Sequence, residues 1–126
     1  MFNRKFGIEI EFTGITRAKA AEIARQYFNA NRVVLGHDWR NAHQVTASDG
    51  RVWKFVYDSS IRCQKKVNRQ IVSAGGDHAV EFVSPILTYR EDINTLQELI
   101  RRLRKAGGFV NKTCGIHYQK LEIIQS

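Results

Sequence analysis

The chain has 126 residues, 43% of them hydrophobic and 25% charged, which is the composition of an ordinary globular domain with one core. No apolar run approaches the about 20 residues that a membrane span needs, and acidic residues interrupt the first apolar stretch, so neither a transmembrane helix nor a signal peptide is predicted. The net charge of +8 allows a nucleic acid, a nucleotide or an acidic protein as partner without choosing among them.

The first predicted strand, Gly7 to Phe12, alternates apolar and acidic residues with the period of a half-buried strand. Its apolar residues would face the core, and Glu9 and Glu11 would share the other face, about 7 Å apart. Like charges on one strand face repel each other. The pair therefore calls for compensation, and a cation is the simplest candidate.

A helix is expected next, from Arg17 to Ala30, with Thr16 as its cap. A short strand, 32–35, should follow and end at Gly36. Residues 43–47 and 51–57 flank Ser48-Asp49-Gly50 and predict a hairpin. The polar and basic region 61–76 is expected to be a mobile loop, part of which could form a strand.

A further strand is predicted at 79–84, where Glu81 shares a face with Val83, and Pro85 should break the pairing. The spacing of Thr88 and Glu91 predicts a capping box that opens a helix over 91–106, which the two glycines 107 and 108 should end. Residues 109–111 and 115–124 read as extended. The order β-α-β-β-β-β-α-β predicts one α+β domain over 1–126, an antiparallel sheet with two helices packed on one face.

Four separated features could converge on the open face of this sheet: the pair Glu9 and Glu11, then Asp58, Glu81 and His117. Carboxylates and a neutral imidazole are ligands for a divalent cation. An oxygen-rich set suits magnesium, which often completes its shell with a phosphate. The alternative for each acid is an exposed strand position beside a lysine or arginine.

A zinc site is a second candidate, because Cys114 and His117 have the C-x-x-H spacing of some zinc ligands. A structural zinc site needs four ligands, and the others would have to come from Cys63, His37, His43 or His78. A lone histidine is more often a hydrogen-bonded structural residue. The chain has only two cysteines and no visible secretion signal, which favours reduced thiols and a cytoplasmic location.

Two basic runs could contact a nucleic acid or an acidic partner. The first run comprises Arg62, Lys65, Lys66 and Arg69, and the second comprises Arg101, Arg102, Arg104 and Lys105. The second run lies in the last turns of the predicted helix, where cations suit the helix dipole, so a solvated helix end is the alternative there.

Several segments in this order resemble the amidoligase family, within the carboxylate-amine ligases related to glutamine synthetase. The matching segments are Phe6 to Phe12, Trp53 to Ser60, Val80 to Leu87, the helix 91–106, and Asn111 to His117 with its Cys-Gly-Ile-His. The resemblance implies an antiparallel sheet whose concave face holds ATP and magnesium. ATP would phosphorylate a substrate carboxylate, and an amine would attack the acyl phosphate to form an amide.

Carried over by position, the resemblance implies site residues of three kinds. Magnesium ligands would be Glu9, Glu11 and Glu81, His117 would line the nucleotide and carboxylate site, and Asp58, Ser60 and Asn111 would belong to the nucleotide or substrate pocket. Family members are frequent in phages and other mobile elements.

The sequence also departs from the family pattern. In the family, a second histidine usually follows two residues after the one at the position of His117, and this chain has Gln119 there. Ser59 replaces the glycine of an Asp-Gly-Ser motif. Family members also extend further than Ser126. We therefore expect the N-terminal half of a ligase domain that has lost catalysis. Such a domain would act by binding a macromolecular partner, an acidic protein or a nucleoprotein complex, for example as a phage or mobile-element inhibitor of a host defence nuclease.

Three other expectations stay open beside this one. The first is an active ATP- and Mg-dependent carboxylate-amine ligase. The second is direct binding of nucleic acid through the two basic runs. The third is self-association, because an incomplete sheet would leave an exposed edge strand.

Overall fold

The structure is a computed structural model that describes residues 4–121. Its strands are β1 (Lys5–Phe12), β2 (Val34–Leu35), β3 (His43–Thr46), β4 (Val52–Val56), β5 (Gln64–Val67), β6 (Gln70–Ser73), β7 (Val80–Val83), β8 (Leu87–Thr88) and β9 (Ile116–Leu121). Its helices are α1 (Arg17–Phe28) and α2 (Tyr89–Lys105), and a 3-10 turn covers Gly76–His78.

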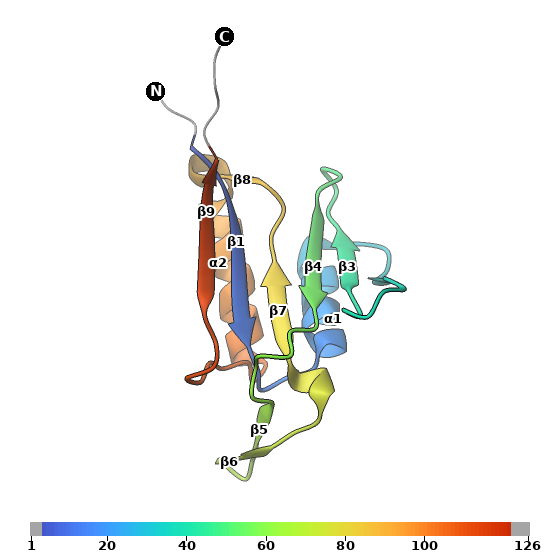
Figure 1. Cartoon of the computed structure of the whole chain (residues 1–126). Coiled ribbons are helices and arrows are strands. Elements are labelled where there is room, and N and C mark those ends of the chain that lie inside the picture. The colour runs from blue at the N-terminus through green and yellow to red at the C-terminus, as the bar shows by residue number, and fades with distance from the viewer. Residues whose placement is uncertain (1–3, 122–126) are drawn as a thin grey trace.

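Within residues 4–121, seven strands form one antiparallel sheet, and both α-helices lie on the same face of it (Figure 1). The order across the sheet is β2-β3-β4-β7-β1, and β9 pairs along the other side of β1. Strand β8 pairs with β1 beyond the point where β7 ends, and Pro85 lies in the break between these two strands. The predicted α+β fold is therefore confirmed.

The core lies between the sheet and the helices. The predicted apolar face of β1 is there, with Phe6 and Phe12 buried, and the α2 stripe adds Leu96, Leu99 and Leu103. Three large aromatic side chains from the middle of the sheet, Trp53, Phe55 and Phe82, are also buried in this core. Neither helix among the described residues has the length and apolar character that crossing a membrane requires.

Among the described residues, the other face of the sheet carries no helix, and it positions the acidic residues of β1. Residues directly opposite each other in an antiparallel pair point to the same face. Glu11 lies opposite Glu81 of β7, and Glu9 lies opposite Val83 on one side and His117 on the other. The alternation read from the sequence thus places these acids on the open face.

The region predicted as a mobile loop contains the hairpin β5–β6, which extends from one end of the sheet (Figure 1). The turn residues Asn68 and Arg69 both have positive φ, 50° and 69°, as a two-residue hairpin turn of type I′ requires. Thr13 ties the hairpin to the body, because its hydroxyl oxygen accepts the Gln64 N–H at 2.9 Å and its hydroxyl donates to the His78 carbonyl at 2.7 Å.

The predicted caps fall at the observed helix boundaries, but one of them bonds differently from the prediction. The Thr16 side chain caps α1 by accepting the Lys19 N–H at 3.0 Å, and α2 ends before Gly107, whose φ is +118°. The predicted capping box at Thr88 is wrong. The Thr88 side chain makes no cap bond, and Asp92 instead accepts the Thr88 N–H at 2.7 Å, so α2 starts at Tyr89.

The last predicted strand, 115–124, is observed as β9 up to Leu121. Residues 122–124 of that prediction lie outside the described residues. Strand β9 pairs with β1 over six residues, from Ile116 opposite Ile10 to Leu121 opposite Lys5. It borders the sheet on this side in the part of the chain that the structure describes.

Candidate functional site

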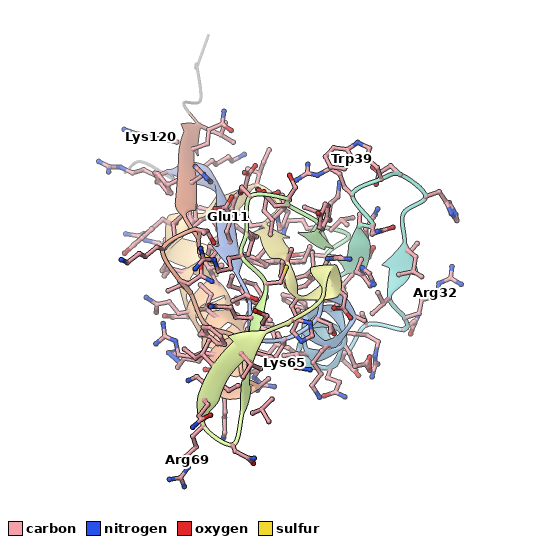
Figure 2. The ribbon with its side chains drawn as sticks, turned by 60° about the horizontal axis from the view of Figure 1, so that its bottom comes forward. Glu11, Arg32, Trp39, Lys65, Arg69 and Lys120 are labelled. Atoms are coloured by element: carbon pink, nitrogen blue, oxygen red, sulfur yellow. The ribbon has the colours of Figure 1, made fainter. Side chains whose placement is uncertain are left out.

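Three carboxylates from separate segments meet on the open face of the sheet. They belong to Glu11 of β1, Glu81 of β7 and Asp58, which follows β4, and one oxygen of each lies within 4.8 Å of the others. The pairing of Val56 with Glu81 brings the end of β4 to this place. We call these three residues the acidic cluster; Figure 2 labels Glu11, which lies near the middle of the molecule in that view.

Glu11 is held from the loop that precedes β9. Its Oε1 accepts the Gly115 N–H at 2.8 Å, and its Oε2 lies 3.8 Å from Nε2 of His117. Burial raises the pKa of Glu11; the Gly115 hydrogen bond opposes that rise, and the contact with Asp58 adds to it. The pKa of Glu11 is raised overall, so a nearby positive charge would stabilise its ionised form.

Glu81 is the most buried carboxylate of the cluster, with 5% of its surface exposed. Burial raises its pKa, and the negative charge of Glu9 raises it further. The guanidinium of Arg40 forms an ion pair with Glu81 and works in the opposite direction. Arg40 comes from the loop between β2 and β3, and its backbone carbonyl accepts the Tyr57 N–H at 2.7 Å, which fixes this loop beside the end of β4.

Asp58 is held by the residues that follow it. Its Oδ1 accepts both the Ser60 N–H at 2.8 Å and the Ser60 hydroxyl at 2.6 Å. Burial would raise the pKa of Asp58, but these hydrogen bonds, together with the contact with Glu11, lower it overall. Ser60, predicted as a pocket residue, therefore orients a member of the acidic cluster.

The remaining predicted site residues lie around the cluster. Glu9 is exposed and falls outside the group of three, opposite His117. The Asn111 amide donates to the Arg62 carbonyl at 3.0 Å and to the Gln64 side chain at 2.9 Å. Asn111 thus fixes the loop that leads to Gly115, and its effect on the cluster is indirect.

Neither cysteine joins the acidic cluster. Cys114 contacts Asn111 through a weak sulfur hydrogen bond of 3.5 Å, and Cys63 contacts the Ile61 carbonyl at 3.7 Å. Burial raises the pKa of the Cys63 thiol, which disfavours the thiolate that zinc requires. Within residues 4–121, the acidic cluster is the one place where the fold brings together three or more side chains that could hold a metal ion.

The two basic runs lie on the hairpin β5–β6 and on the last turns of α2. Figure 2 shows Lys65 and Arg69 on the hairpin, well away from Glu11. Arg101 and Arg102 both pair with Glu98 at 3.2 Å, and the Arg102 guanidinium stacks over the Tyr27 ring at 4.7 Å. Part of the second run therefore has partners within the protein.

Arg40 is a functional candidate that the sequence does not reveal. It lies in an irregular loop with no periodicity or motif, and 41 residues separate it from Glu81. Asp58 is expected from the sequence among the converging residues, but no local pattern gives its distance from Glu11 and Glu81. The pairing of β4 with β7 supplies that information.

The fold and the acidic cluster define an α+β domain with an oxygen-rich site on the open face of an antiparallel sheet. A model of the protein family described as "Putative amidoligase enzyme" matches residues 2–119, and the chain belongs to this family. The resemblance drawn from the sequence motifs is thereby confirmed. No curated protein and no solved structure matches the chain significantly.

Proposed function

We propose that the acidic cluster binds a divalent cation together with the phosphates of a nucleotide, and that it serves the ATP-dependent joining of a carboxylate to an amine. One observation carries this proposal: three carboxylates from distant segments lie within 4.8 Å of one another, and two of them, Glu11 and Glu81, are buried. Membership of an amidoligase family supports the reaction class.

The donor set fits magnesium. Every oxygen of the cluster comes from a carboxylate, and hard oxygen ligands are those that magnesium prefers. Buried like charges at this distance repel each other, so the arrangement is costly without a counter-charge. The Arg40 guanidinium supplies one positive charge against three carboxylates, which leaves the cluster short of neutralisation.

Protein groups outside the cluster orient its ligands. The Gly115 N–H fixes one oxygen of Glu11, and the Ser60 backbone and hydroxyl fix one oxygen of Asp58, so each carboxylate keeps an oxygen available. A bound cation would offset the charge of phosphate oxygens, which is the main electrostatic task in phosphoryl transfer. His117 lies beside Glu11, in a position to contact a bound anion.

The non-catalytic partner-binding function expected from the sequence receives less support from this geometry. A domain that acts only through its outer surface has no need to bury two carboxylates next to a third. That function stays a prediction, as do its phage or mobile-element setting and the acidic or nucleoprotein partner.

The test is a thermal unfolding experiment with Mg²⁺ and ATP at 1 mM each. A dissociation constant near 0.1 mM would stabilise the protein by about 1.4 kcal/mol and raise Tm by about 4 °C or more. The double variant Glu11→Gln with Glu81→Gln should lose this rise. Glu91→Gln removes an exposed carboxylate of α2 and is the matched control, which should keep it.

The absence of any rise for the unaltered protein at millimolar Mg²⁺ and ATP would refute the proposal. An equal rise in the double variant would show that the nucleotide binds elsewhere.

A further inference from the structure

A cavity of about 630 Å³ opens between β9 and the start of α2, lined by Arg4, Tyr89, Arg90, Ile93 and Tyr118. Tyr89 and Tyr118 are 57% and 56% exposed. The rings of both pack against the buried Phe6, with centroid distances of 6.4 Å and 5.4 Å. The cavity therefore presents two supported aromatic rings beside two arginines.

This cavity lies on the opposite face of the sheet from the acidic cluster. Side chains alternate along β9, so His117, opposite Glu9, points to the open face. Tyr118 lies opposite Ile8, and Ile116 lies opposite Ile10. Ile8 and Ile10 of β1 pack against the core, which is on the helix side of the sheet. Consecutive residues of β9 thus serve different faces.

A basic stripe runs from the cavity along the exposed side of α2. At 3.6 residues per turn, five exposed positions fall within an arc of about 80°, and they are Arg90, Asn94, Gln97, Arg101 and Arg104. The stripe is about 21 Å long. The acidic residues Glu91 and Glu98 lie outside this arc, on the flank where Arg102 stacks over Tyr27 of α1.

The combination of ring faces and arginines fits one kind of ligand best. Bases of a single strand stack on aromatic side chains, while arginines contact the phosphates. A duplex offers no unstacked base, and an acidic peptide offers charge without planar faces. We infer that the cavity and the α2 stripe form a binding surface for single-stranded nucleic acid, distinct from the acidic cluster.

The net charge of +8 agrees with a polyanionic ligand. Among residues 4–121, neither Arg4 nor Arg90 forms an ion pair, so both charges are available to a ligand. The hairpin β5–β6 lies near the far end of the stripe, since Lys66 sits over the ring of Phe109, which follows α2. Two residues of the second basic run, Arg101 and Arg104, thus belong to this surface, and the first run lies near its far end.

The test measures fluorescence anisotropy of a labelled 12-nucleotide oligothymidine at 50 and 200 mM NaCl. Binding should weaken with salt, because phosphate contacts release counterions. Arg90→Ala and Arg104→Ala should each weaken binding and reduce the salt slope by about 0.7. Arg32→Ala is the matched control: Arg32 is exposed and lies across the molecule from Lys120 of β9 in Figure 2, so its removal should change binding less than twofold.

Stacking is tested separately from charge. Tyr118→Ala should weaken binding at least fivefold, whereas Tyr118→Phe, which keeps the ring, should stay within twofold of the unaltered protein. Because Tyr118 is more than half exposed, both variants should keep the same Tm within about 2 °C.

Several results would overturn the inference. They are no anisotropy change at 50 μM protein and 50 mM NaCl, equal losses in Arg90→Ala and Arg32→Ala, or equal binding by Tyr118→Ala and the unaltered protein. Competition by inorganic polyphosphate as strong as by oligothymidine would show charge recognition without base stacking. Tighter binding of a duplex or of polyglutamate would assign the surface to a different partner.

Discussion

The guanidinium of Arg40 lies against Glu81 and adds one positive charge to the three carboxylates of the acidic cluster. Its side chain is 40% exposed whereas that of Glu81 is buried, so Arg40 should leave the carboxylate only when another positive charge replaces it. Arg40 and a bound cation would both neutralise Glu81. Under the proposed function, Arg40 therefore competes with the cation for Glu81, in addition to acting as a counter-charge.

Replacing Arg40 by alanine should raise the affinity for Mn²⁺, a substitute for Mg²⁺, by about fivefold, the size expected when a partly exposed ion pair no longer competes. Isothermal titration without nucleotide measures this effect. Arg32→Ala removes an exposed arginine elsewhere and should leave the affinity unchanged. A weaker affinity in Arg40→Ala would mean that Arg40 helps to build the site.

The sequence period predicts which face the site residues on regular strands occupy, whereas nothing in the sequence predicts the loop residue Arg40. The alternation in β1 predicts that Glu9 and Glu11 share one face, and the same period predicts the position of Glu81. Arg40 lies in a loop whose path depends on a backbone hydrogen bond to Tyr57. No local pattern encodes such a contact, so only the fold reveals it.

At the scale of the elements, the start of α2 is fixed by one buried carboxylate. Asp92 is 8% exposed; it accepts two hydrogen bonds from the Arg51 guanidinium, at 2.9 and 2.8 Å, and the Thr88 N–H. Arg51 follows the turn between β3 and β4, so this contact ties that hairpin to α2. The Arg51 hydrogen bonds hold the pKa of Asp92 below its ordinary value.

Asp92→Asn should lower the free energy of unfolding by about 1–2 kcal/mol at pH 7, through loss of the ion pair and weakening of the cap. The pKa of Asp92 is lower in the folded than in the unfolded protein. Its stabilisation is therefore present above the unfolded value of about 3.9 and is lost as pH falls through the folded value. Urea unfolding at pH 7 and pH 2.5 measures the difference from the unaltered protein.

The difference between Asp92→Asn and the unaltered protein should shrink toward pH 2.5, while Glu91→Gln, one residue away and exposed, should change stability by less than about 0.5 kcal/mol. A difference that stays the same at both pH values would mean that the Asp92 charge does not matter.

The elements are predicted accurately where periodicity is strong and less so where turn chemistry decides. The apolar stripe predicts helix α2. Thr88 and Glu91 have the spacing of a capping box, but Asp92 and not Glu91 accepts the Thr88 N–H. Spacing alone does not show which of the two carboxylates makes this hydrogen bond. The hairpin β5–β6 has a turn at Asn68 and Arg69 that contains no glycine, and its first arm is mostly polar. The local sequence therefore allows a strand in this region without predicting the hairpin.

At the scale of the whole molecule, acidic and basic functions are assigned to opposite faces of the sheet. The acidic cluster occupies the open face, whereas the cavity and the stripe on α2 occupy the helix side. The two proposed sites should therefore act almost independently.

If the sites are independent, the double variant Glu11→Gln with Glu81→Gln should bind oligothymidine within about twofold as tightly as the unaltered protein. Saturating oligothymidine should also leave unchanged the rise in Tm that Mg²⁺ and ATP cause. Anisotropy and thermal unfolding measure the two halves of this prediction. A change in oligothymidine affinity of more than tenfold would show that the two sites are coupled.

Strand β9 carries His117 toward the acidic cluster and the next residue, Tyr118, toward the cavity. A slip of β9 against β1 by one residue would exchange the two side chains, sending Tyr118 to the open face and His117 to the helix side. The register of β9 is consequently fixed by both faces together.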